Sequence, residues 1–91
     1  MQPYVTLYRY SGPVLGGGTE RFEKVRQIVA EEKGRMLYVY GLLGAYDALS
    51  IAEFPDNRTA MRAAARIGNL ISAQTNTMAA VEGDDFLQLL S

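Results

Sequence analysis

The residues best suited to chemistry in this chain are Tyr46 and Asp47, which follow Gly44 and Ala45 at a predicted turn. A carboxylate beside a tyrosine hydroxyl is able to act as a general base or to orient a hydrogen-bond donor of a substrate. Aspartate beside a glycine turn also commonly accepts hydrogen bonds from backbone N–H groups and so fixes the turn. On the residues alone we favour the structural role, and we assign no catalytic residue.

Cysteine and histidine are both absent from the sequence. Without cysteine there is no disulfide, no thiolate metal site and no thiol nucleophile. Without histidine the usual general base, the usual zinc ligand and the Ser-His-Asp arrangement are excluded. The acids Glu53, Asp56, Glu82, Asp84 and Asp85 form no spaced carboxylate motif, and we interpret them as helix caps and solvated charge. We therefore expect no metal and no cofactor.

Two further patterns resemble ligand-binding segments. Gly16, Gly17 and Gly18 precede a predicted helix, where free backbone N–H groups attract anions. The segment lacks the lysine–serine continuation and the spaced glycines of phosphate-binding loops, so we favour a flexible connector.

Thr75 and Thr77 share one face of a predicted strand and could bind a ligand through their hydroxyls. The preference of threonine for strands explains this pair without a ligand, and this is the interpretation we favour.

Composition restricts the classes of partner. The 91 residues are 48 % hydrophobic and 21 % charged, which is typical of one globular domain spanning residues 1–91. A net charge of −1 does not favour binding to nucleic acid or to an anionic membrane surface. No segment approaches the roughly 20 apolar residues of a membrane span, and no signal peptide is evident. We expect a cytoplasmic protein.

The elements that must position these residues follow from hydrophobic period and from breakers. Thr19 is a plausible start for the first helix and Gly34 a plausible stop, while Asp56 is a strong N-cap for the second helix. The resulting order is βαββαβ with a short terminal helix. Strands are predicted at 4–10, 35–42, 46–54 and 74–81, and helices from 19, over 57–67 and after 83.

This order predicts an α+β fold of the ferredoxin-like type, in which a four-stranded antiparallel sheet carries two helices on one face. The other sheet face remains open unless something covers it. In the first strand, Val5 and Leu7 are expected to face the helices, which places Tyr4, Tyr8 and Tyr10 on the open face.

The second and third strands are harder to orient, because a slip of one residue moves every side chain to the other face. A two-residue turn at Gly44 and Ala45 would align Tyr38 and Tyr40 with Leu49 and Ile51. A three-residue turn would instead align the two tyrosines with Ala48, Ser50 and Ala52. Under either register the open face carries a large apolar or aromatic area.

Three roles compete for the open face. The favoured one is an oligomer interface, because monomers rarely leave such a patch exposed and because tyrosine suits interfaces. A ligand pocket between this face and a partner sheet is compatible with the first role. Stacking of nucleic-acid bases is the third role, but the acidic balance and the lack of interleaved basic and aromatic residues argue against it.

Several short motifs follow one another along the chain. Gly44-Ala45-Tyr46-Asp47 is followed by the apolar strand that ends at Glu53 and by Pro55-Asp56. An alanine-rich helix then leads to Gly68-Asn69 and to Thr75-x-Thr77. In this order of motifs the sequence resembles the GYD domain family. Two departures are a longer segment between Asn69 and Thr75 and a first loop richer in glycine.

The resemblance implies a dimeric α/β barrel, in which two ferredoxin-like sheets pack face to face. It also implies similarity to stand-alone effector-binding domains of leucine-responsive bacterial regulators, which bind amino acids at subunit contacts. We therefore expect a bacterial homo-oligomer that senses a small organic ligand or serves assembly, and not an enzyme. Tyr8, Tyr38, Tyr46 and Asp47 are expected to line the ligand site. The alternative is a cofactor-free enzyme acting on a small aromatic or carbonyl compound, with Asp47 as base and Tyr46 as hydrogen-bond donor.

Overall fold

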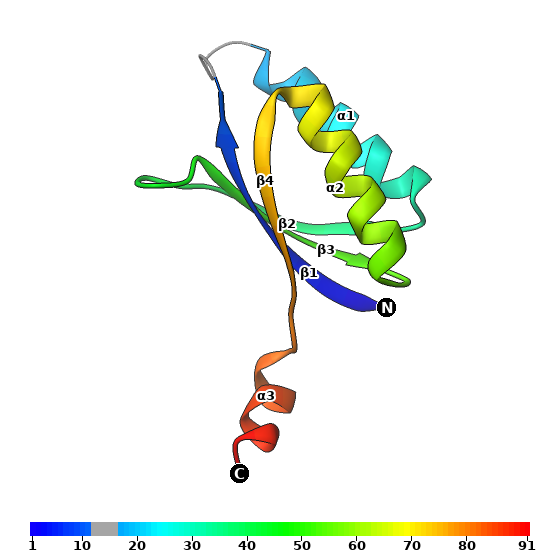
Figure 1. The fold of residues 1–91 in the computed structure, drawn as a ribbon, viewed down its shortest axis with the longest axis vertical. Helices are drawn as coiled ribbons and strands as arrows, with labels where there is room; N and C mark the ends of the chain where they lie inside the picture. Colours follow the sequence, from blue (N-terminus) through cyan, green and yellow to red (C-terminus); the bar gives the residue numbers. More distant parts are fainter. Residues whose placement is uncertain (12–16) are drawn as a thin grey trace.

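The computed structural model of the protein describes residues 1–11 and 17–91. Two long helices lie side by side on one face of the sheet, and a third short helix projects away beyond the last strand (Figure 1). The strands are β1 (Gln2–Tyr10), β2 (Arg35–Gly41), β3 (Ala48–Phe54) and β4 (Ala73–Ala79). The helices are α1 (Gly18–Glu31), α2 (Asn57–Ile71) and α3 (Gly83–Leu89).

The sheet order is β2-β3-β1-β4, and the three pairings are antiparallel. This is the ferredoxin-like arrangement that the element order predicts, because each helical crossover skips one strand position. Helix α1 connects β1 to β2 with β3 between them, and α2 connects β3 to β4 with β1 between them. The fold expectation is therefore confirmed. The two edge strands are β2 and β4.

The faces of β1 are the reverse of the prediction. Tyr4 and Tyr8 are 4 % and 5 % exposed and point toward the helices, so Val5 and Leu7 lie on the open face. The reason lies in α2, where Ala60 and Ala63 are buried and bring the helix close to the sheet. Small helix side chains leave room for large rings between the two layers. Each buried hydroxyl also has a partner, as a buried phenol requires.

Of the two registers considered for the central strands, the structure adopts the first. Tyr38 pairs with Ile51 and Tyr40 pairs with Leu49. The connection is nevertheless a loop of residues 42–47 and not a two-residue turn, and a bulge lies between Met36 and Tyr38. Predicted strand bounds were wrong here, because Tyr46 and Asp47 belong to this loop and not to β3.

Helix α2 is longer than predicted. It continues through Gly68 and Asn69 to Ile71, and Ser72 then adopts a left-handed conformation with φ 53°. Ile67 and Ile71, four residues apart, are both buried on the same helix face, and their burial outweighs the local preference of glycine for helix ends. A Cβ at Gly68 would lie 3.1 Å from the Ala73 carbonyl oxygen, so glycine here permits close contact with β4.

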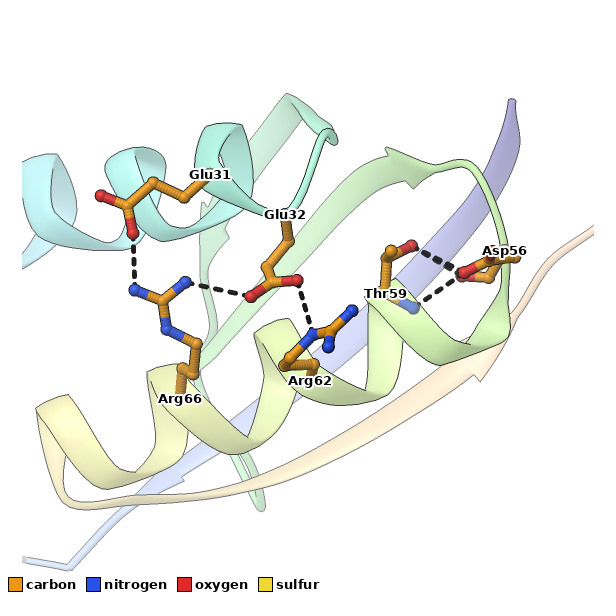
Figure 2. Close-up of polar contacts among 6 residues, drawn as sticks. All are labelled: Glu31, Glu32, Asp56, Thr59, Arg62 and Arg66. Atoms are coloured by element: carbon orange, nitrogen blue, oxygen red, sulfur yellow. Dashed lines mark hydrogen bonds and ion pairs between the residues drawn. The ribbon is translucent and has the colours of Figure 1, made fainter.

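The two long helices are joined by ion pairs (Figure 2). Arg66 contacts Glu31 at 2.6 Å and Glu32 at 3.1 Å, and Arg62 contacts Glu32 at 2.8 Å. Two acids at the C-terminal end of α1 oppose the helix dipole, and the arginines of α2 compensate for this charge. The hydrogen bond from Arg66 accordingly lowers the pKa of Glu31 below its ordinary value.

Asp56 caps α2, as predicted from sequence. Its carboxylate accepts a 2.8 Å hydrogen bond from the backbone N–H of Thr59, and this bond lowers the pKa of Asp56 below its ordinary value of 3.8 (Figure 2).

A lowered pKa of Asp56 in the folded state makes a testable contribution to stability. The contribution is complete above the ordinary pKa of 3.8 and is lost as the pH falls through the lower, folded-state pKa. In Asp56→Asn the amide still caps the helix, so its deficit against the wild type should disappear in acid. Asp56→Ala lacks an acceptor and should stay less stable at every pH. Urea unfolding of the three proteins at neutral and acid pH measures this, and a pH-independent deficit in Asp56→Asn would contradict it.

Candidate functional site

A pocket of about 260 Å³ lies between the first half of α1 and the helix side of the sheet. Its walls are mainly apolar, and its polar groups come from α1, from the two central strands and from the loop before β3. The lining residues are Tyr8, Tyr10, Gly18, Arg21, Phe22, Val25, Met36, Val39, Tyr40, Gly41, Asp47, Ala48, Ser50 and Ile71. Ligand sites typically combine such an apolar wall with a few polar groups that orient the ligand.

A buried hydroxyl pair forms part of this lining. The Tyr8 hydroxyl and Ser50 Oγ are 2.7 Å apart, and Ser50 is only 3 % exposed. Burial raises the pKa of Tyr8 above its ordinary value, so the phenol keeps its proton at neutral pH. The pair therefore offers neutral hydroxyl groups, and not a phenolate, to anything that enters the pocket.

Tyr8→Phe should destabilise the protein, because it leaves the buried Ser50 hydroxyl without this partner. The expected loss is about 1–3 kcal/mol, the penalty for an unsatisfied buried polar group. Ser50→Ala likewise leaves the buried Tyr8 hydroxyl without its hydrogen-bond partner, whereas the double variant removes both hydroxyl groups. Denaturant unfolding of the four proteins should therefore show a double-variant loss smaller than the sum of the single losses. Strict additivity of the two losses would show that the hydroxyls do not interact.

Asp47 holds the loop of residues 42–47 against the end of β1. Its Oδ2 accepts a 2.8 Å hydrogen bond from the backbone N–H of Tyr10, and its own N–H donates to the Tyr8 carbonyl oxygen at 2.8 Å. The carboxylate thus has the structural role favoured on sequence grounds. Its hydrogen bond connects the loop to β1, and does not stay within the turn. Asp47 also lines the pocket that Tyr8 and Ser50 line.

Tyr46 lies in a different place from Asp47. The Arg9 guanidinium carbon is 5.1 Å from the centre of the Tyr46 ring, and Arg9 Nε donates to the Ala45 carbonyl oxygen. Both residues line a second, smaller hollow with Gln74, Thr75 and Asn76. The ring therefore serves a cation–π contact that packs the loop against β1.

Tyr38 lies on the open sheet face, where its ring stacks on that of Tyr40 with centres 6.3 Å apart. Of the four residues predicted to form one site, the structure therefore brings together only Tyr8 and Asp47. The other pocket residues, notably Phe22, Val25 and Ser50, were not predicted. Ser50 had a usable signal, because it is the one hydroxyl in the apolar run of β3.

Gly17 and Gly18 of the glycine-rich segment are the N-cap and the first residue of α1, and Gly16 lies outside the described residues. Thr75 and Thr77 are half-buried, and Thr77 Oγ1 lies 2.9 Å from Thr6 Oγ1. Among residues 1–11 and 17–91, no group of three or more acids forms a candidate metal site. In this same part of the chain, no helix is long and apolar enough to cross a membrane.

Comparison with known proteins gives a family and a structural relative. The GYD domain family matches residues 4–90. The crystal structure of the leucine response regulatory protein LrpA of Mycobacterium tuberculosis superimposes with a TM-score of 0.68 at 13 % identity. The match covers 89 % of this chain and 51 % of LrpA, so the chain spans about half of that regulator. At this identity the likeness shows the fold alone. Comparison with curated proteins found no match.

Proposed function

Because the chain belongs to the GYD domain family, we propose that it is a homodimeric ligand-sensing module whose open sheet face forms the contact between subunits. The expected setting is the bacterial cytoplasm. Its proposed partners are a second copy of itself and a small organic molecule.

The chemistry of the open face supports the assembly. Its centre is apolar, and charged side chains lie toward its ends, at Arg9 and at the Arg35–Glu53 ion pair. A central apolar patch with a polar rim is the usual composition of a protein interface. The apolar side chains of the face are those of Val5, Leu7, Tyr38, Tyr40, Leu49, Ile51 and Met78.

Two copies could bury this face with one two-fold axis, because each copy presents the same surface. Tyr38 and Tyr40 are 57 % and 54 % exposed, so more than half of the surface of each residue is available to a partner. Monomeric proteins rarely leave so large an apolar patch uncovered.

The ligand is proposed to enter the pocket on the helix side of the sheet. A volume near 260 Å³ lies below the roughly 300–1,000 Å³ of drug-sized sites, so a molecule of amino-acid or single-ring size fits. The apolar walls suit an apolar body, and the Tyr8–Ser50 hydroxyl pair suits one polar group.

Tyr40 is the observation that carries the sensing role. The residue lines the pocket on the helix side of edge strand β2, while its ring lies on the open face, where it stacks on Tyr38 beside Leu49. A ligand that touches Tyr40 therefore touches a residue of the proposed interface. By linkage, a ligand that changes the affinity of the subunits must itself bind with an affinity that depends on assembly.

Native mass spectrometry of the purified protein, followed by titration with leucine, phenylalanine and indole, tests the proposal. We expect a dimer, a raised melting temperature with at least one probe, and a shifted dimer dissociation constant at saturation. Val39→Trp should fill part of the pocket, which Val39 lines, and abolish the response. Leu43→Trp, at a fully exposed loop position, is the matched control and should retain it.

Each part of the proposal has its own contrary result. A protein that stays monomeric at every concentration would overturn the assembly. A dimer that neither retains nor responds to any small molecule would overturn the sensing role. Conversion of a probe into a product would favour the enzymatic alternative, with Asp47 beside the pocket as the residue to substitute next.

A further inference from the structure

Helix α3 exposes apolar side chains to solvent. Phe86, Leu87, Leu89 and Leu90 are between 51 % and 73 % exposed, and none of the seven residues of the described helix is buried. Their spacing places them on one side of the helix, opposite Asp84, Asp85 and Gln88. An amphipathic helix of this kind is stable when its apolar side is covered, because seven residues are too few for an isolated helix.

The link to β4 directs α3 away from its own sheet. Ala80 is still held in place, because its N–H donates to the Pro3 carbonyl oxygen and its own carbonyl accepts from Gln2 Nε2. Only Val81 and Glu82 separate this anchored residue from the helix, and Glu82 is extended, with φ −59° and ψ 147°. The helix consequently projects beyond the end of the sheet (Figure 1).

A groove that the apolar side of a helix could occupy lies between α2 and the edge strand β4. It is a groove of about 480 Å³ whose lining includes Ala60, Met61, Ala64, Ala65 and Thr77. Met61 is 71 % exposed, and the alanines provide a shallow floor on which a second helix can lie closely. Arg58, three residues before Met61 on α2, is exposed, and its charge is opposite to that of the acids of α3.

The size of the sheet face favours a second copy as the donor of the helix. Four strands spaced about 4.8 Å apart, of seven to nine residues rising about 3.3 Å each, give a flat footprint on the order of 450–500 Å², and the accessible surface of the side chains on it is larger. A stable interface of standard size takes about 800 Å² from each partner. Phe86 and the three leucines would supply several hundred Å² more, since one buried aromatic alone contributes about 150–250 Å².

We propose that α3 of each subunit docks in the α2–β4 groove of the second copy, so that the two subunits exchange C-terminal helices. This inference rests on the proposed dimer and adds to it a second contact, made by helix-in-groove recognition. Phe86, Leu89 and Leu90, at i, i+3 and i+4, are the anchors.

Cross-linking between two different chains tests the exchange directly. The chain has no cysteine, so each introduced thiol is unique. Met61→Cys protein is mixed with isotopically heavy Gln88→Cys protein and treated with a short bismaleimide. We expect a cross-linked pair of one light and one heavy chain. Leu43→Cys in place of Met61→Cys is the matched control, and it should give no such product because it lies in the loop before β3.

The other outcomes overturn the exchange. If a variant with both thiols in one chain cross-links only within itself on dilution, α3 folds onto its own groove. The absence of any Met61–Gln88 product also contradicts the proposal. Sedimentation of the wild type separates the two proposals. A dimer that gives no Met61–Gln88 product contradicts only the helix exchange, whereas a monomer contradicts both the dimer and the exchange.

Substitution of the anchors gives an independent measurement. Phe86→Ser with Leu90→Ser should raise the dimer dissociation constant by at least about tenfold, since buried aromatic anchors dominate interface affinity. Gln88→Ala, on the polar side of α3, is the control and should leave the constant unchanged. Equal dissociation constants in all three proteins would contradict docking of the apolar side.

Discussion

Leu49→Lys is expected to convert the proposed dimer into a monomer while leaving the protein folded. Leu49 pairs with Leu7 on one side and with Tyr40 on the other, so it lies near the middle of the open face. In the monomer a lysine at this place reaches solvent and costs little. In a symmetric dimer two lysines would be buried without partners, at a cost of several kcal/mol.

The dimer dissociation constant should therefore rise by about 1,000-fold or more, which corresponds to about 4 kcal/mol. Sedimentation velocity over a range of concentrations measures the constant, and far-UV circular dichroism reports whether the fold persists. Leu43→Lys is the matched control, because Leu43 is fully exposed outside the sheet. A Leu49→Lys protein that remains a dimer would show that the subunits do not meet through this face.

Gly34→Ala is expected to cost about 3 kcal/mol of folding free energy, at the upper end of what overpacking usually costs. A Cβ at this position would lie 2.6 Å from the Glu53 carbonyl oxygen and 2.6 Å from two carbons of the Phe54 ring. Neither can move aside easily, because one is strand backbone and the Phe54 ring is 5 % exposed. Urea unfolding of both proteins at the same protein concentration measures the loss, because a concentration-dependent contribution from association is then compared under equal conditions.

The neighbouring Lys33 provides the matched comparison. Its φ of 63° lies in the left-handed region, and its N–H donates to Ala30 while that of Gly34 donates to Val29, as in a Schellman helix end. Lys33→Gly should therefore stabilise the protein by about 0.5–1 kcal/mol, since glycine adopts this conformation without steric cost. If Gly34→Ala proved harmless and Lys33→Gly harmful, the left-handed residue at this helix end would be Gly34.

Much of the fold was predictable because its signals are local. Pro55 and Asp56 end a strand and begin a helix through restrictions on their own backbone and side chain, and they do so wherever the chain folds. The spacing of apolar residues is also a local signal, because it differs between a strand and a helix before any tertiary contact forms. The order of elements then leaves few topologies, of which the ferredoxin-like one is observed.

Less of the candidate site was predictable, because its residues meet only through tertiary packing. Tyr8 and Ser50 lie 42 positions apart, and their hydrogen bond exists because β1 and β3 are neighbours in the sheet. Tyr46 and Asp47 are adjacent in sequence, yet they serve different hollows because their side chains diverge from the loop. Adjacency in sequence was therefore a poor guide to a shared site.

The sequence by itself determined the elements, their order and the presence of a sheet face that two helices leave open. Only the tertiary structure decided which side chains occupy that face. Tyrosine is apolar along its ring and polar at its tip, so it suits a subunit contact and a buried core equally well. Tyr4 and Tyr8 face the core because the small alanine side chains of α2 leave room for their rings. Their hydroxyls are also satisfied there, by Asn57 and Ser50 respectively.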